Sequence, residues 1–171
     1  MATTLKQCIL VAITLIAFNT VSARVTMDNL LSNKEKSIIS IAALTAKGDL
    51  SRLQKEIATG LESGLTINQI KEIQVHSYAY CGFPRSIRGL QTLMQVVDER
   101  KSKGIQDPVG NDATPIKDSL SKYDRGRITL GKLTNSNQTR PTAGYGAFAP
   151  VIDAFLKEHL FADIFDRDVL T

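Results

Sequence analysis

The chain has no tryptophan, two cysteines and two histidines in 171 residues. With so few cysteines it cannot be a small disulfide-built domain, and we expect neither a metal nor a cofactor. Neither sign of charge dominates, because the formal net charge is +4 and basic residues are interleaved with acidic ones. This balance provides no basic patch, so nucleic acid is not an expected partner. The length suits one domain, or one domain and a fragment.

The first 23 residues have the pattern of a secretory signal peptide. Lys6 supplies the positive charge, an apolar run extends from Cys8 to Phe18, and Val21-Ser22-Ala23 offers a small-residue cleavage site. The run is shorter than the roughly 20 residues of a membrane span, although an uncleaved anchor is the alternative. Cleavage predicts a secreted or periplasmic chain that begins at Arg24 and has no stable membrane span.

Cleavage would also decide the role of the cysteines. It would remove Cys8 and leave Cys81 as the single cysteine of the mature chain. One cysteine cannot form an intrachain disulfide. Cys81 is then a free thiol, an intermolecular partner or a small buried apolar residue.

Residues 28–104 show four helical patterns joined by short turns, with no convincing strand pattern. The capping boxes Ser32-x-x-Glu35 and Thr66-x-x-Gln69 start the first and third helices, and Pro84 suits the first turn of the fourth. We therefore predict an all-α domain with antiparallel neighbours. The expected inner faces are Ile38, Ile41, Ala42 and Thr45; Leu50, Leu53, Ile57 and Leu61; Ile67, Ile70, Ile73, Ser77 and Tyr80; and Ile87, Leu90, Met94 and Val97.

The composition changes after this domain. Residues 105–147 are rich in Gly, Pro, Asn, Asp, Ser and Thr, which predicts a long extended arm or linker. Residues 148–165 are again helical in pattern, with enough large apolar side chains to indicate a buried or partnered helix. The last four residues, DVLT, echo residues 28–32, DNLLS, so 148–171 is interpreted as a helix and the start of a possible second repeat.

The candidate site lies on the third predicted helix. Glu72, His76 and Tyr80 are spaced i, i+4 and i+8, which places them on one stripe. A carboxylate one turn from an imidazole can orient the ring and fix its tautomer, so His76 is a candidate general acid or base. The competing interpretation is an ordinary exposed pair on a helix surface.

Cys81 ends this helix, and Arg85 and Arg88 follow in the first turns of the next one. A helix start with two nearby cations favours an anion, so these arginines are candidates for binding a substrate carboxylate. The alternatives are a cysteine that fills the core and two ordinary surface charges. His159, beside Glu158 on the late helix, is interpreted as structural.

The run His76-Ser77-Tyr78-Ala79-Tyr80-Cys81-Gly82-Phe83-Pro84-Arg85 resembles the H-x-x-x-Y-x-G-x-P segment of carboxymuconolactone decarboxylase-like proteins. Residues 41–46 (IAALTA) and 64–66 (GLT) match the same family's pattern. The resemblance covers about residues 30–104. It implies a helical bundle of the alkylhydroperoxidase D-like type that assembles as a trimer or hexamer, sometimes from tandem copies.

The resembled family includes two chemistries. In the decarboxylases, a histidine that His76 matches handles protons on a small carboxylated substrate, and Arg88 stands where they have a second histidine. The alkylhydroperoxidase D-like branch reduces peroxides or peroxiredoxin partners with a C-x-x-C pair, which Cys81-Gly82-Phe83-Pro84 does not provide. A cycle with Cys81 and an outside thiol is the second hypothesis, and a non-catalytic oligomeric binding protein is the third.

Overall fold

The computed structural model describes residues 30–170, and the predicted signal peptide lies outside this range. Helices and no strands make up the regular structure of the described part, so the all-α prediction is confirmed. No helix in residues 30–170 is long and apolar enough to cross a membrane. The elements are α2 (Asn33–Lys47), α3 (Leu50–Glu62), α4 (Ile67–Cys81), α5 (Phe83–Ser102), α6 (Lys122–Thr134), α7 (Gly144–Phe148), α8 (Pro150–Phe155) and the π-helix η1 (Leu156–Ile164).

Both predicted capping boxes are present. At the start of α2, Ser32 Oγ accepts from the Glu35 amide at 3.3 Å, and the Glu35 carboxylate accepts from the Ser32 amide at 2.7 Å. At the start of α4, Thr66 and Gln69 exchange the equivalent pair at 3.1 and 3.0 Å. These bonds satisfy amide groups that have no partner inside the helix, so the sequence sets both helix starts locally.

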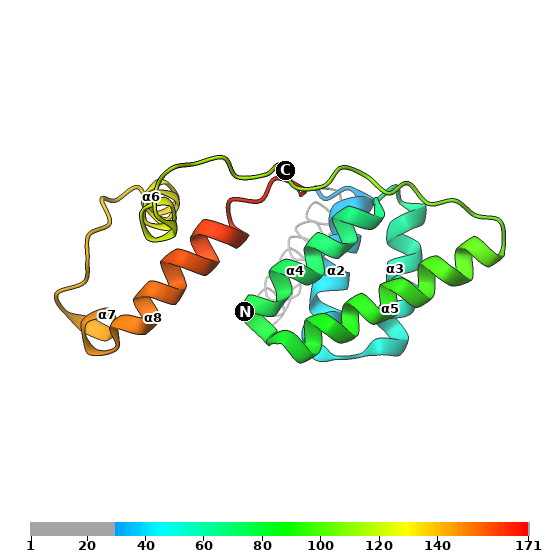
Figure 1. The fold of residues 1–171 in the computed structure, drawn as a ribbon. Coiled ribbons are helices and arrows are strands. Elements are labelled where there is room, and N and C mark those ends of the chain that lie inside the picture. The colour runs from blue at the N-terminus through cyan, green and yellow to red at the C-terminus, as the bar shows by residue number, and fades with distance from the viewer. Residues whose placement is uncertain (1–29, 171) are drawn as a thin grey trace, which may run out of the picture.

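Helices α2 to α5 form a bundle, and α6 to η1 form a second lobe beside it (Figure 1). The bundle encloses one apolar core, to which all four helices contribute. The buried members are Ile41, Leu44, Leu53, Ile57, Leu61, Leu65, Ile70, Ile73, Leu93 and Val96. Leu170, close to the end of the chain, packs against the same core and brings the C-terminal segment back to the bundle.

The predicted inner face of α5 is wrong at Ile87 and Met94, whereas Val97 packs against the core as expected. Met94 is 65% exposed and Ile87 is also exposed, whereas Leu93 and Val96 are buried together with Ser86, Gly89 and Thr92. The reason is that α5 crosses close to α4 at Gln74. A Cβ on Gly89 would lie 2.1 Å from Gln74 Oε1, so a larger residue there would displace the Gln74 side chain. Ser86 Oγ donates a hydrogen bond to the Gln74 carbonyl at the same crossing. Small residues face α4 there, so the more apolar stripe points outward.

The predicted arm is extended only in its first part. Residues 105–119 have no regular structure and run over the bundle (Figure 1). The Pro108 carbonyl accepts a hydrogen bond from the Ile67 amide at 3.0 Å, and the Val109 carbonyl accepts one from the Asn68 amide at 2.8 Å. The extended prediction is wrong for 122–134, which form α6. Gly126 lies within this helix, where a Cβ would lie 1.7 Å from the Lys157 carbonyl oxygen, so close packing on η1 requires the glycine.

A buried ion pair holds the second lobe together. Lys157 is 2% exposed, and its Nζ donates to Asp153 Oδ1 at 2.6 Å, while the Tyr123 hydroxyl donates to Asp153 Oδ2 at 2.7 Å. Burial by itself would raise the pKa of Asp153, but the bonds from Lys157 and Tyr123 outweigh it and hold this pKa below its ordinary value. The pair therefore joins α6, α8 and η1 through ionised groups.

Lys157→Met is expected to open the second lobe, because it leaves the Asp153 carboxylate buried without its cation. Breaking a buried pair in this way costs about 3–5 kcal/mol. Hydrogen exchange should show loss of protection in α6 and η1 while α2 to α5 keep theirs. Lys117→Met, which changes an exposed lysine of the arm, is the control. Unchanged protection of η1 would show that the pair does not hold the lobe.

Candidate functional site

Glu72 and His76 come together on α4 as the spacing predicts. His76 Nε2 lies 3.2 Å from Glu72 Oε1, one helical turn away. Glu72 is buried at 3% exposure, whereas the His76 side chain is 25% exposed. The carboxylate is therefore hidden behind an imidazole that a small molecule can still reach, which is not the geometry of an exposed surface pair.

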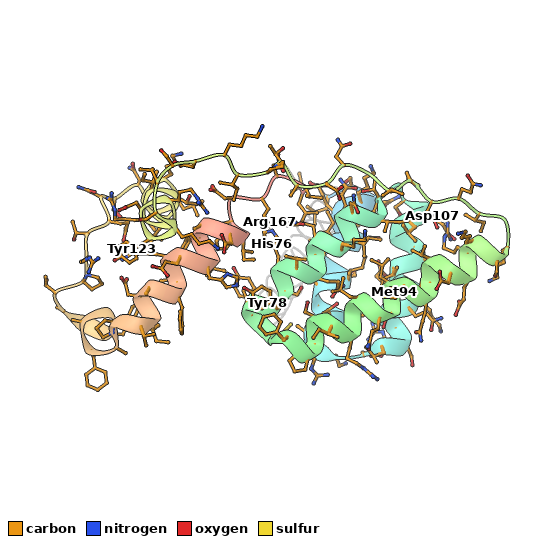
Figure 2. The ribbon with its side chains drawn as sticks, in the orientation of Figure 1. His76, Tyr78, Met94, Asp107, Tyr123 and Arg167 are labelled. Carbon is orange, nitrogen blue, oxygen red and sulfur yellow. The ribbon has the colours of Figure 1, made fainter. Side chains whose placement is uncertain are left out.

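The C-terminal segment adds a third member, Arg167. Its Nε and Nη2 donate to the two oxygens of Glu72 at 2.5 and 2.8 Å, across 95 positions of sequence. Figure 2 shows Arg167 and His76 close to one another where this segment passes α4. The hydrogen bonds with Glu72 raise the pKa of Arg167 above its ordinary value. No periodicity in the sequence could have identified this residue.

Aromatic side chains of the second lobe contact α4 at two positions. The Phe165 ring meets His76 edge-on, with centroids 6.1 Å apart. Tyr78 stacks on Phe83 at 4.5 Å and contacts His159 at 5.5 Å. His159, interpreted as structural from the sequence, also lies 3.3 Å from Asp163 through Nδ1. The site is thus formed between α4 and the end of η1.

The predicted substrate-binding residues Tyr80, Arg85 and Arg88 are all exposed. Tyr80 is 72% exposed, and Arg88 is exposed on α5. Arg85 lies against the C-terminal end of α2, since a Cβ on Gly48 would be 1.5 Å from its Nη1. A cation is favourable at a helix C-terminus, which gives Arg85 a structural explanation. A carboxylate clamp formed by Arg85 and Arg88 stays a prediction.

Cys81 is half-buried at the last position of α4. Its Sγ–H donates to the Ser77 carbonyl oxygen at 3.0 Å. Five positions separate it from His76, which corresponds to about 140° around an α-helix. The thiol and the imidazole therefore leave the helix on different sides.

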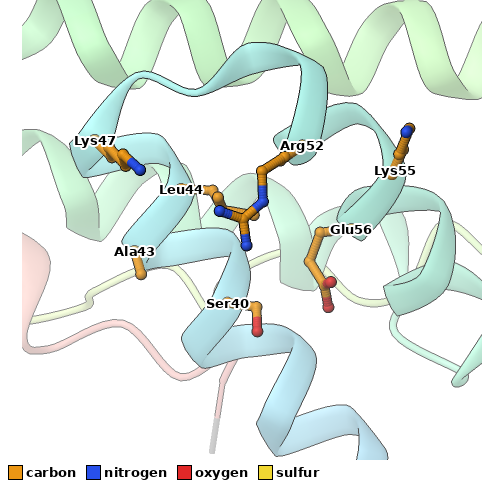
Figure 3. A pocket seen from close by; sticks show the side chains of 7 residues that line it. All are labelled: Ser40, Ala43, Leu44, Lys47, Arg52, Lys55 and Glu56. Carbon is orange, nitrogen blue, oxygen red and sulfur yellow. The ribbon is translucent and has the colours of Figure 1, made fainter.

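A separate groove of about 410 Å³ lies between α2 and α3 (Figure 3). It receives no residue from α4 or from the C-terminal segment, so it is distinct from the His76 site. Its basic side chains are exposed, and nothing in the described chain fixes an anion there. The lining residues are Ser40, Ala43, Leu44, Lys47, Arg52, Lys55 and Glu56.

Within residues 30–170, no group of three or more His, Cys, Asp or Glu side chains is arranged to hold a metal ion. The polar groups gathered at the site are the Glu72 carboxylate, the His76 imidazole and the Arg167 guanidinium. Such a set can exchange a proton and stabilise negative charge.

Residues 12–93 match the model of the carboxymuconolactone decarboxylase family. The match contains Glu72, His76 and Cys81, begins within the predicted signal peptide and ends inside α5. Arg167 and the whole second lobe lie outside it. Comparison with curated proteins and with solved structures found no match to this chain. Over these residues, the helical bundle of this protein is similar to the carboxymuconolactone decarboxylase family.

Proposed function

We propose that the protein acts on a small carboxylated molecule by proton transfer, with His76 as the general acid or base and Glu72 as the residue that orients it. The observation that supports this is the buried Glu72 carboxylate, which contacts His76 Nε2 on one side and Arg167 on the other. The similarity of residues 12–93 to the carboxymuconolactone decarboxylase family agrees with the proposal.

We propose a task for each nitrogen of His76 from its contact with Glu72. Because Nε2 faces the Glu72 carboxylate, it carries a hydrogen, and Nδ1 is the nitrogen that exchanges a proton with the substrate. In a decarboxylation, the bond between the substrate carbon and its carboxylate breaks, carbon dioxide leaves and the electron pair stays on carbon. Nδ1 of His76 then passes to that carbon a proton that the neutral imidazole has first taken up from solvent.

The proposed substrate class rests on the cation at the site. Arg167 lies beside His76 and is half-buried, and its guanidinium carries N–H donors beyond the two that Glu72 accepts, so a carboxylate that approaches His76 meets hydrogen-bond donors. Arg85 and Arg88 are retained as candidates for the outer part of the binding surface.

The substitution His76→Gln is expected to lower turnover at least about 100-fold, because the amide cannot exchange a proton. A screen of lactone acids and β-keto acids supplies the substrate for this measurement. His159→Gln changes the other histidine of the chain and is expected to keep activity within a few-fold. Full turnover by His76→Gln would exclude the proposal.

A peroxidase that uses Cys81 with an outside thiol is the alternative enzyme. It has weaker support, because the Cys81 thiol donates to the Ser77 carbonyl and points away from His76. Peroxide consumption that persists in Cys81→Ser would eliminate this alternative, whereas its loss together with normal lyase activity would favour it.

We also propose that the protein is a homo-oligomer, a trimer or hexamer, which is equally the expectation for a non-catalytic binding protein. The support is the apolar stripe that α5 presents outward, where Met94 and Ile87 are exposed next to Phe83. A shallow groove of about 370 Å³ continues this stripe. Its lining residues are Ile67, Lys71, Leu90, Leu93, Met94, Val97 and Asp98.

Met94→Lys is expected to dissociate the assembly, because it places a charge in an apolar contact. Sedimentation velocity should show the wild-type oligomer replaced by monomer. Gln95→Lys puts the same charge at the next exposed position of α5 and should leave the oligomer intact. A wild-type protein that sediments as a monomer would contradict the assembly.

Export by the N-terminal signal is proposed on the sequence pattern alone. The mass of the mature protein measures it directly, and a chain that begins at Arg24 is expected. A mature chain that retains residues 1–23 would refute export by this route.

A further inference from the structure

A buried carboxylate needs a partner, and Glu72 has two. Removing an ionised carboxylate from water costs several kcal/mol unless a cation or hydrogen bonds compensate. Arg167 offers a permanent charge and two donors, whereas His76 offers one nitrogen at 3.2 Å. Which partner carries the compensating positive charge decides the protonation state of His76.

We propose that Arg167 is a positioning residue for His76: its two hydrogen bonds neutralise Glu72, so that Glu72 orients His76 without forcing a proton onto it. This inference rests on the proposed role of His76 in proton transfer. Arg167 touches Glu72 and acts on His76 through it.

The other charged groups nearby do not replace Arg167. From η1, His159 is paired with Asp163 and its ring contacts Tyr78 rather than His76. Asp168 acts on the charge of Arg167. The ionic contacts described at the His76 face are therefore those of Glu72 and Arg167, and loss of Arg167 leaves the imidazole to balance the carboxylate.

The C-terminal segment is anchored well enough to hold Arg167 in place. The Arg167 amide donates to the Ile164 carbonyl at 3.3 Å, and the Thr114 amide donates to Asp168 Oδ1 at 2.9 Å. Leu170 packs against the core of the bundle. These contacts fix the backbone on both sides of Arg167, so its guanidinium is positioned by the fold rather than by the ion pair alone.

Carbethoxylation by diethyl pyrocarbonate tests the proposal, since only a neutral imidazole reacts. The whole protein is treated at pH 7 and the modified peptides are quantified by mass spectrometry, with N-acetylhistidine in the same tube as the rate reference. In Arg167→Gln, His76 is expected to react about tenfold more slowly than in the wild type, because it holds the proton that balances Glu72. Arg167→Lys keeps the charge and is expected to stay within about twofold of the wild type.

The direction of the change separates this role from a structural one. If Arg167 only keeps the C-terminal segment closed, Arg167→Gln exposes His76 and the carbethoxylation of His76 becomes faster. A faster rate or an unchanged rate overturns the proposal. The double variant Glu72→Gln with Arg167→Gln removes both charges and should restore the wild-type rate; a slow double variant is a contradiction. No substrate is involved, so failure of the proposed enzyme activity would be seen separately in the turnover of His76→Gln.

Discussion

The bidentate ion pair between Arg167 and Glu72 is the interaction on which the candidate site depends. It joins residues 95 positions apart and places a guanidinium against a carboxylate that α4 has already buried. Without it, Glu72 would lose its permanent countercharge, and the C-terminal segment would meet this face of α4 through ring contacts such as Phe165 on His76. The setting of His76 thus depends on a residue that the C-terminal segment brings to α4.

The second lobe makes this ion pair possible. Its own stability comes from another buried pair, Lys157 with Asp153, and from the glycine contact that brings α6 onto η1. The arm helps from the other side, because Arg100 donates to both oxygens of Asp107 at 2.8 Å and fixes the start of the extended chain. The family-matched bundle therefore supplies the acid–base pair, and the remainder of the chain supplies its cation.

Local rules predicted the parts of the fold that local interactions determine. The capping boxes at Ser32 and Thr66 located α2 and α4, and the i, i+4 spacing brought Glu72 to His76. The spacing of apolar residues did not predict the inner face of α5 correctly, because the close crossing with α4 favours small residues such as Gly89 there. Tyr80 was also expected on an inner face, yet it is exposed near the end of α4.

The parts that the sequence did not reveal depend on contacts between distant segments. Gly126 is unfavourable inside a helix by its intrinsic propensity, but α6 requires it because a Cβ there would collide with the backbone of η1. Arg167 has no motif, since its role arises only when the chain returns to α4. Arg85 and Arg88 looked suitable by proximity in sequence, yet Arg85 lies at the end of α2.

A double-mutant cycle between Glu72 and Arg167 tests the central claim most directly. The quantity to measure is the free energy of opening of η1, from native-state hydrogen exchange, in the wild type, Glu72→Gln, Arg167→Gln and the double variant. The ion pair predicts a coupling free energy of about 1–3 kcal/mol, because each single variant strands the other charge. Additive effects with no coupling would show that the two residues do not depend on each other, and the account of the site would be wrong.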